Sequence, residues 1–573
     1  MRIVILNNDI EALDYSNSHR NDNDIVIPLG VTARYFAVEN NWQITTLSSL
    51  ISDGDYLQAK LDSEKRIKSL VEELNEYSIS VAKKFPLTIG DYFHFQLHVA
   101  IGQIHLHKHI IDSIEKKFNP ELWILYQYEN ENTEFRPHSF ISFCDIFLKS
   151  PYKMQGTILK LNDGWNEGDK NQLKKSWKQK VKKYLPRRII TKINELRLTL
   201  KYSQWNLFKK NKLFQFGALY DWSALLMDKK FKKSYFVDFN QSTGIINSDN
   251  LDNTILEILN KSITFENVPV YDLTNQAKTI QGTLKFFDAR VLKLINKIKK
   301  YDAVISTVFV FPIENLFGHI ANFLNKPVIN WQHGEMNLYD DIFTDFLEAK
   351  YTTHYFCYGK EVAPLYESYI GNSPMKQVYV VGNNRKTIRG GNGNLIIYAT
   401  GKWLSTGTPF IDSIDPDSRL FDAQEKILKY LESLDKSHNI VFKPNPGPNT
   451  LPFKLKNVKI EYNKSFTELL ENAKLVILDT PATTCVETAA TKIPLFILSG
   501  RVPWYDKPMQ MIKKRAIVDD IPSDLTESVD KYLKEGYYPA DTHNTEFLDG
   551  WGSSLNTAMV KKNAINILKE IIQ

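Results

Sequence analysis

The stretch Leu475-Val-Ile-Leu-Asp-Thr-Pro-Ala-Thr-Thr-Cys-Val-Glu-Thr-Ala-Ala490 decides the fold class of this chain. It begins with an apolar run typical of a buried strand, passes through a polar turn that contains a proline, and continues as a helix. A strand that leads through a short turn into a helix is the unit from which parallel sheets covered by helices are built. The sequence therefore predicts an α/β protein, with this turn at the carboxyl edge of a sheet.

The same alternation continues on both sides of that stretch. Further strands are predicted at residues 395–399, 440–442, 458–460 and 494–498, with helical segments among them. Such regular alternation resembles a nucleotide-binding domain of the Rossmann type.

The length of 573 residues calls for more than one domain, because a single hydrophobic core stops growing at about 250–300 residues. The polar, glycine-rich segment 382–394 has no apolar period and is the predicted boundary. We expect a Rossmann-like N-terminal domain at residues 1–383 and a Rossmann-like C-terminal domain at residues 384–555. An amphipathic helix at residues 556–573 is expected to pack back on the N-terminal domain.

The net charge of +6 conceals a strongly basic insertion at about residues 165–213. Between Lys170 and Lys212 there are fifteen Lys and Arg residues and one acid, Glu195. Such a local field points to an anionic partner surface. Nucleic acid is disfavoured, because no DNA- or RNA-binding module is recognisable around it.

Part of this insertion has the pattern of an amphipathic helix. Its lysines lie opposite an apolar stripe formed by Leu173, Trp177, Val181 and Leu185. Two interpretations stay open: a helix that lies peripherally on an anionic inner-membrane surface, and a solvated surface helix.

The three cysteines, Cys144, Cys357 and Cys485, have no metal-ligand spacing and are expected to be packing residues. This usage fits a reducing compartment. The first residues, Met1-Arg-Ile-Val-Ile-Leu6, lack the features of a signal peptide, and no window is long and apolar enough to cross a membrane. We therefore predict a cytoplasmic protein.

The turn after residues 475–478 carries Thr483 and Thr484, where a helix begins. Free backbone N–H groups and the positive end of the helix dipole make such a position suitable for a phosphate. The alternative interpretation is an ordinary helix cap without a ligand.

Two other turns follow predicted strands of the same sheet. The first, Ile440-Val-Phe-Lys-Pro-Asn-Pro446, places Lys443, Asn445 and Pro446 directly after a strand. The second contains Thr400 and Gly401. Because open α/β sheets bind nucleotides at the carboxyl ends of their strands, these turns are predicted to bind a nucleotide together.

The order of these motifs resembles that of bacterial sialyltransferases and Kdo transferases. Their nucleotide domain carries a "Lys-Pro-His-Pro"-like turn followed by a Ser/Thr-rich loop that binds the phosphate of CMP. Here Asn445 stands where that family usually has histidine, which keeps a side-chain donor and loses a titratable group. The resemblance implies that Lys443, Thr483 and Thr484 bind the donor phosphate.

The N-terminal half contains a similar motif. The segment Val328-Ile-Asn-Trp-Gln-His-Gly-Glu335 is a strand that ends in histidine and glycine, and it resembles the "Gln-His-Gly" turn of the same glycosyltransferases. In that family such strand ends face the second domain, which implies that His333 positions the donor or the acceptor. The alternative is a structural histidine.

Two acidic segments resemble those of retaining Kdo transferases. One contains Glu129 and Asn130, although the tryptophan that the family has soon afterwards is missing; the other, Phe214–Trp222, contains Asp221. Two carboxylates can act as nucleophile and acid/base partner in glycosyl transfer with retention. The resemblance implies that Asp221 is the nucleophile, with Asp238 as its competitor, and that Glu129 transfers protons.

Together these observations predict a GT-B protein, in which two Rossmann-like domains face a central cleft. We expect a glycosyltransferase of surface polysaccharide assembly that transfers a CMP-activated ulosonic acid, either Kdo or a nonulosonic acid such as pseudaminic acid. The acceptor would be an oligosaccharide or lipid-linked glycan of a capsule or O-antigen. No metal is inferred, and no cofactor is expected besides the CMP-sugar donor. The alternatives are a polyol phosphate transferase that uses CDP-glycerol and a non-catalytic glycan-assembly scaffold.

Overall fold

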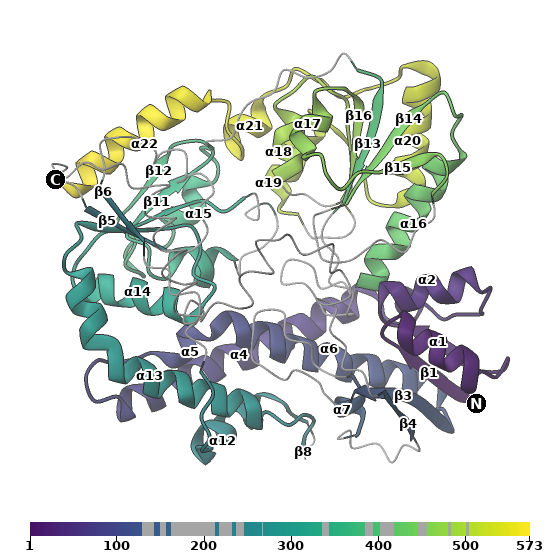
Figure 1. Ribbon diagram of the computed structural model, residues 1–573. Coiled ribbons are helices and arrows are strands. Elements are labelled where there is room, and N and C mark those ends of the chain that lie inside the picture. Colours follow the sequence, from purple (N-terminus) through teal and green to yellow (C-terminus); the bar gives the residue numbers. More distant parts are fainter. Residues whose placement is uncertain are drawn as a thin grey trace, which may run out of the picture.

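A computed structural model shows the arrangement of the chain in space (Figure 1). The described residues are 1–128, 143–148, 156–161, 212–216, 232–235, 246–265, 268–334, 338, 343–383, 393–400, 417–444, 455–479, 483–499 and 504–573.

The C-terminal sheet has six parallel strands, of which the first strand in the chain lies third in space. This is the strand order 3-2-1-4-5-6 of a Rossmann domain. The central strands are buried on both faces, which explains their continuous apolar sequences. In spatial order the strands are β15 (Val458–Ile460), β14 (Asn439–Lys443), β13 (Leu395–Ala399), β16 (Ala473–Leu478), β17 (Leu495–Leu498) and β18 (Ile517–Asp519).

A second sheet of six parallel strands occupies the middle of the chain. Its strands are β12 (Gln377–Val380), β11 (His354–Cys357), β10 (Val328–Trp331), β9 (Ala303–Ser306), β5 (Lys212–Gln215) and β6 (Lys232–Tyr235), in spatial order. The middle and C-terminal sheets belong to the two Rossmann-like domains of a GT-B fold, which confirms the predicted fold class.

A third, smaller parallel sheet is formed by the N-terminal residues. Its strands are, in spatial order, β2 (Ile25–Pro28), β1 (Arg2–Leu6), β3 (Leu122–Tyr128) and β4 (Gly156–Leu161). The sequence predicts one Rossmann-like domain at residues 1–383, whereas the described part of this range contains two separate parallel sheets. The boundary at residue 384 itself stays a prediction, because residues 384–392 lie outside the described residues.

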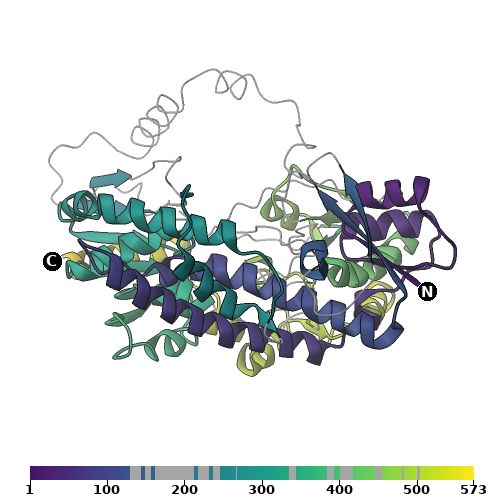
Figure 2. The same ribbon diagram turned by 90° about the horizontal axis from the view of Figure 1, so that it is seen from below.

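Long helices connect the small sheet to the middle sheet (Figure 2). The helix α4 begins after a capping box in which Ser52 and Asp55 satisfy one another's backbone N–H groups. One continuous hydrophobic core runs from the small sheet through these helices to the middle sheet. The helices of this layer are α4 (Asp53–Val81), α5 (Ile89–Tyr92), α6 (His94–Phe118), α12 (Asn253–Ser262), α13 (Thr274–Ile298) and α14 (Pro312–Phe323).

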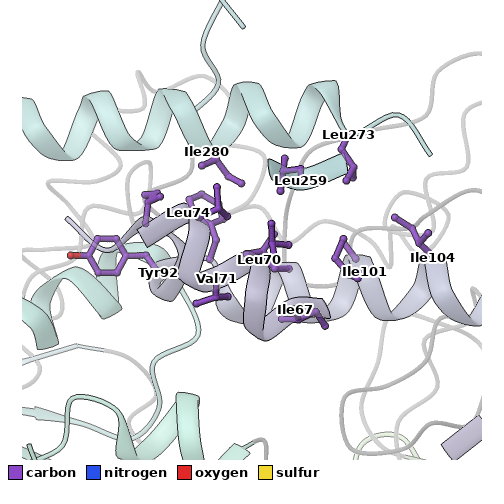
Figure 3. Close-up of a cluster of buried hydrophobic side chains, with 14 of the residues drawn as sticks. Ile67, Leu70, Val71, Leu74, Tyr92, Ile101, Ile104, Leu259, Leu273 and Ile280 are labelled. Carbon is purple, nitrogen blue, oxygen red and sulfur yellow. The ribbon is translucent and has the colours of Figure 1, made fainter. Parts of the chain in front are cut away.

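The core of this layer follows from helical spacing (Figure 3). On α4, the apolar residues Ile67, Leu70, Val71 and Leu74 recur at intervals of three and four and are all buried. They pack with side chains of α6, α12 and α13, including Ile101, Ile104, Leu259 and Ile280.

The last helix, α22 (Thr557–Ile572), follows the C-terminal domain in the sequence but lies against the middle sheet (Figure 1). Val560, Ala564 and Leu568 are buried against Trp331 and Phe356 of that sheet. The chain thus returns to the middle domain after it has formed the C-terminal domain.

The remaining described helices cover the sheets or form turns. Among the described residues, no helix is long and apolar enough to cross a membrane. These helices are α1 (Asp9–Ser18), α2 (Val31–Glu39), α3 (Leu47–Leu50), α7 (Phe143–Leu148), the π-helix η2 (Phe343–Ala349), α15 (Ala363–Glu367), α16 (Asp417–Ser433), α17 (Phe466–Leu470), α18 (Thr483–Ala489), α19 (Asp506–Lys513), α20 (Pro522–Glu535) and α21 (Glu546–Gly550), and the short strands β7 (Thr264–Phe265) and β8 (Val268–Pro269) form a hairpin.

Helices beside the small sheet also contact the C-terminal domain, where α2 and α3 lie beside α16 (Figure 1). The Arg34 guanidinium forms ion pairs with Asp422 and Glu425, and its side chain is only 9% exposed. Ser48 donates a hydrogen bond of 2.7 Å to the second oxygen of Asp422. Burial lowers the pKa of Arg34, and the negative charge of Glu425 opposes that shift.

We expect Arg34→Ala to lower the free energy of unfolding by about 3 kcal/mol, because it leaves the partly buried Asp422 carboxylate without its cation and leaves Glu425 with only the exposed Lys429. The matched control is Lys429→Ala, which removes a 72% exposed partner of the same Glu425 and should cost about 0.5 kcal/mol or less. Thermal unfolding of both variants measures the difference. Equal melting temperatures would show that the buried pair contributes no more than a surface pair.

Candidate functional site

The carboxyl ends of the middle and C-terminal sheets meet at Gly334 and Thr483. A methyl group placed on the Cα of Gly334 would lie 3.7 Å from the Thr483 Oγ1. Gly334 follows β10, and Thr483 begins α18 after β16. The structure therefore brings together two motifs that are about 150 residues apart in the sequence and that were both predicted to form the site.

On the C-terminal side, a buried carboxylate fixes the turn that follows β13. Asp479, the first polar residue after β16, accepts hydrogen bonds from the Tyr398 hydroxyl at 2.6 Å and from the Thr400 Oγ1 at 2.7 Å. Gln424 of α16 donates a further hydrogen bond to Thr400. The predicted Thr400 therefore lies beside the strand end that leads to Thr483, and Asp479 restrains it.

The predicted phosphate ligand Lys443 lies at the end of β14, where it pairs with Ala399 of β13. Its ammonium donates hydrogen bonds to the backbone carbonyls of Glu461 at 3.1 Å and Tyr462 at 3.4 Å. Burial lowers the pKa of Lys443, and the negative charge of Glu461 opposes that shift. Because an ammonium has three N–H groups, these two carbonyls, its partners among the described residues, leave one donor for a ligand.

On the middle-domain side, hydrogen bonds to Tyr358 and Glu348 and one within the turn restrain Gln332-His333-Gly334. Gln332 is buried: its Oε1 accepts from the Tyr358 N–H at 2.8 Å, and its Nε2 donates to the Gly334 carbonyl at 2.9 Å. The His333 N–H donates to Glu348 Oε1 at 2.8 Å. Gly334 has a φ of +67°, which favours glycine. His333 is half-buried in this turn.

Several predicted site residues lie outside the described residues. They are Glu129, Asn130, Asp221, Asp238, Gly401, Asn445 and Pro446, together with most of the basic insertion 165–213. The residues that the structure does bring to the facing strand ends are His333, Thr400, Thr483 and, on the next strand along, Lys443. Thr483 and its neighbour Thr484 are half-buried in the first turn of α18.

Three residues near these turns were not singled out from the sequence. Asp479 was part of the quoted stretch, and its position directly after an apolar strand was an available signal. Gln424 and Glu348 gave no signal, because each lies in a helical segment whose contacts with the turns arise only in the folded chain.

The three cysteines are buried and unpaired with one another. Burial raises the pKa of the Cys357 thiol to about 12, so this thiol stays protonated. Within the described ranges, no group of three or more His, Cys, Asp or Glu side chains could hold a metal ion. Metal-independent chemistry stays a prediction.

Two Rossmann-like domains with facing strand ends define the GT-B fold of this protein. The chain belongs to the family described as LIC12162 family transferase, whose model matches residues 54–501. No curated protein matches the chain in sequence.

Similar solved structures share the fold at low identity. They include MnaA of S. aureus with UDP, at 12% identity and a TM-score of 0.37, covering 63% of this chain and 96% of that one. MurG of Acinetobacter baumannii has 11% identity and a TM-score of 0.36, with 63% and 100% covered. The glycosyltransferase SnogD from Streptomyces nogalater has 12% identity and a TM-score of 0.34, with 63% and 100% covered.

We expect Asp479→Asn to lower the free energy of unfolding by about 1–3 kcal/mol, because the neutral amide oxygen is a weaker acceptor than the carboxylate oxygen to which both buried hydroxyl groups donate. Asp520→Asn is the control: Asp520 is exposed and accepts one hydrogen bond, from Ser499 at 2.5 Å. Urea unfolding of both variants gives the comparison. An equal loss in the two variants would mean that Asp479 does not restrain the Thr400 turn.

Proposed function

We propose that this protein is a glycosyltransferase that binds a nucleotide-activated sugar between its two Rossmann-like domains. The observation that carries this proposal is the approach of Gly334 to Thr483, because it unites the two predicted motifs at facing strand ends. Strand ends of open α/β sheets are where nucleotides bind in such folds. The absence of a Cβ at Gly334 lets the main chain approach a ligand closely.

The proposed donor is a CMP-activated ulosonic acid, Kdo or a nonulosonic acid such as pseudaminic acid. The support is the order of the Lys443 turn and the Thr483 turn, which resembles that of CMP-sugar transferases. Thr483, Thr484 and the remaining N–H of Lys443 would donate hydrogen bonds to the donor phosphate, while Thr400, whose hydroxyl donates to Asp479, would line the site beside them. The acceptor would be a glycan of a capsule or O-antigen, and the basic insertion would contact an anionic membrane surface.

We expect CMP to raise the melting temperature more than CDP, UDP or GDP does, and to do so in EDTA, because a ligand that binds only the folded state stabilises it. At a concentration of 100 times its Kd such a ligand contributes about 2.7 kcal/mol. A stronger effect of UDP, or loss of the CMP effect in EDTA, would contradict the proposed donor. Turnover of CDP-glycerol would favour the polyol phosphate transferase, and turnover of no donor would favour a scaffold.

A pair of glycine variants tests whether the nucleotide binds at this place. Gly334→Ala and Gly536→Ala introduce the same strain, since the two φ angles are +67° and +69°. A methyl group at Gly536 has nothing within 4 Å, whereas at Gly334 it faces Thr483. Nucleotide binding that weakens only in Gly334→Ala supports the site, and equal binding in both variants places the nucleotide elsewhere.

For the chemistry we propose double displacement with retention. The Asp221 carboxylate would attack the anomeric carbon while the bond from that carbon to the CMP phosphate breaks, and CMP leaves with the bonding electrons. Glu129 would then take the proton of the acceptor hydroxyl as its oxygen displaces Asp221 from the sugar. His333 would position the donor or the acceptor.

We expect an enzyme slowed by Glu129→Gln to accumulate a sugar covalently bound to the peptide that contains Asp221. Mass spectrometry of the protein incubated with donor detects this adduct. Asp221→Asn should lose several orders of magnitude in turnover and keep donor binding. An adduct on Asp238 would move the nucleophile to that residue, and near-normal turnover of Asp221→Asn would exclude Asp221 from the chemistry.

A further inference from the structure

Glu348 is a buried carboxylate that contacts the main chain of the Gln332-His333-Gly334 turn (the His333 turn). It is 1% exposed and lies in the π-helix η2. Its Oε1 accepts the His333 N–H at 2.8 Å, and its Oε2 accepts the hydroxyl groups of Tyr355, at 2.6 Å, and of Tyr366. All three donors therefore match a carboxylate, which only accepts hydrogen bonds.

The main chain of Glu348 is also fixed to the end of β10. Its carbonyl accepts hydrogen bonds from Asn330 Nδ2 at 2.9 Å and from the Thr352 hydroxyl. A π-helix is a rare conformation that is found frequently at functional sites. Here it places the side chain and the carbonyl of one residue against the same strand end.

The helical layer restrains η2 from the other side. The Phe346 ring stacks on His94 of α6, with 4.1 Å between the ring centroids and 22° between the planes. Lys350, next to η2, donates to Asp91 of α5 at 2.5 Å. Neither contact involves the His333 turn, so Glu348 has a fixed support that is independent of the turn.

Stability alone does not account for a carboxylate at this position. A buried ionised group costs free energy, and apolar residues of similar volume often replace it without loss. One oxygen of Glu348, Oε1, accepts the His333 N–H. We propose that Glu348 is a positioning residue, which in its ionised form fixes the Gln332-His333-Gly334 turn so that Gly334 faces Thr483. This inference rests on the proposed function, because it assigns a role within the same site.

The inference predicts a dependence on pH. Burial raises the pKa of Glu348 to about 7, and the hydrogen bonds from Tyr355, Tyr366 and the His333 N–H oppose that shift. Burial also raises the pKa of Tyr355 well above its usual value, so Tyr355 stays a donor throughout. Protonation of Glu348 below about pH 7 therefore replaces charge-assisted hydrogen bonds, including the one from the His333 N–H, by weaker neutral ones, and the turn loosens.

Protonation of Glu348 affects the free energy of unfolding with the opposite sign to its effect on the turn. Because the folded-state pKa lies above the ordinary value of 4.5, the contribution of Glu348 to stability is largest at low pH and decreases as the pH rises through about 7. The folded protein is thus less stable with Glu348 ionised, the form that fixes the turn, than with Glu348 protonated. Loosening of the turn at low pH cannot be attributed to acid unfolding through Glu348.

Glu314 provides a matched control. It is also buried, its pKa is also raised to about 7 by burial, and its Oε2 accepts the backbone N–H groups of Val310 and Phe311 at 3.0 Å each. It caps α14 and makes none of these contacts with the His333 turn. Glu314→Gln and Glu348→Gln therefore remove the same charge at two places in one domain.

The first experiment is amide hydrogen exchange of the peptide that contains residues 331–334, in the full chain without ligand, at about pH 6 and about pH 8. After correction for intrinsic exchange, we expect stronger protection at the higher pH in the wild type and in Glu314→Gln. Glu348→Gln should exchange faster and lose this pH dependence. Protection that is independent of pH, or identical in the two variants, would overturn the inference.

A second variant covers the case in which Glu348→Gln does not fold. Tyr366→Phe removes one donor to Oε2 and leaves the His333 N–H in place. It should move the midpoint of the pH-dependent protection to higher pH, because the carboxylate loses a hydrogen bond. A purely structural role of Tyr366 would leave the midpoint unchanged, and that result would also overturn the inference.

The kinetic experiment uses a CMP-sugar donor. Displacement of a positioning group by about 1 Å can cost about 100-fold in rate, so kcat of Glu348→Gln should fall by about that factor while KM for the donor changes less. Its acidic limb in the pH profile should disappear, whereas Glu314→Gln keeps it. Failure of every CMP-sugar to react would refute the proposed donor, and hydrogen exchange, which needs no donor, would still decide the role of Glu348.

Discussion

The structure depends on a close contact between the main chains of its two Rossmann-like domains. Gly359, just after β11, lies so near Gly550 of α21 that a methyl group on it would overlap the Gly550 carbonyl. Directly after Gly359, the Lys360 N–H donates to the Asp549 carbonyl at 3.2 Å and the Glu361 N–H to the Gly550 carbonyl at 2.8 Å. Because no side chain separates the domains here, their spacing is fixed by the backbone. The approach of the facing strand ends follows from that spacing.

At the facing edge of each domain, a buried carboxylate accepts hydrogen bonds from hydroxyl groups and restrains a turn. Asp479 accepts from Tyr398 and Thr400 in the C-terminal domain. Glu348 accepts from Tyr355, Tyr366 and the His333 N–H in the middle domain. Buried polar groups of this kind are costly unless fully hydrogen-bonded, and they then rigidify their surroundings. The turns proposed to bind the donor are thus restrained by buried hydrogen bonds of the fold.

The small N-terminal sheet gives the molecule a second connection between its halves. One hydrophobic core joins this sheet to the middle domain through α4 and α6, and the Arg34 ion pairs join it to α16. The helix α16 also carries Gln424, which donates to Thr400. The residues of α16 that pair with Arg34 therefore lie next to Gln424 in the sequence, and Gln424 contacts the Thr400 turn. A movement of the C-terminal domain would have to break the Arg34 ion pairs or move the small sheet with it.

The sequence by itself determined the C-terminal Rossmann-like domain and the strand ends that carry His333, Thr400 and Thr483. Those features depend on local periodicity, so the predicted strands at 395–399 and 458–460 coincide with β13 and β15. Only the tertiary structure decided that β1 pairs with β3 in a separate sheet, across more than a hundred residues of mostly helical chain. It also decided that Lys443 donates to two carbonyls beside β15 and that Glu348 contacts the His333 turn. Strand partners and buried hydrogen bonds between distant residues leave no periodic trace in a sequence, because they are fixed by how the packed elements meet and not by the conformation of either segment alone.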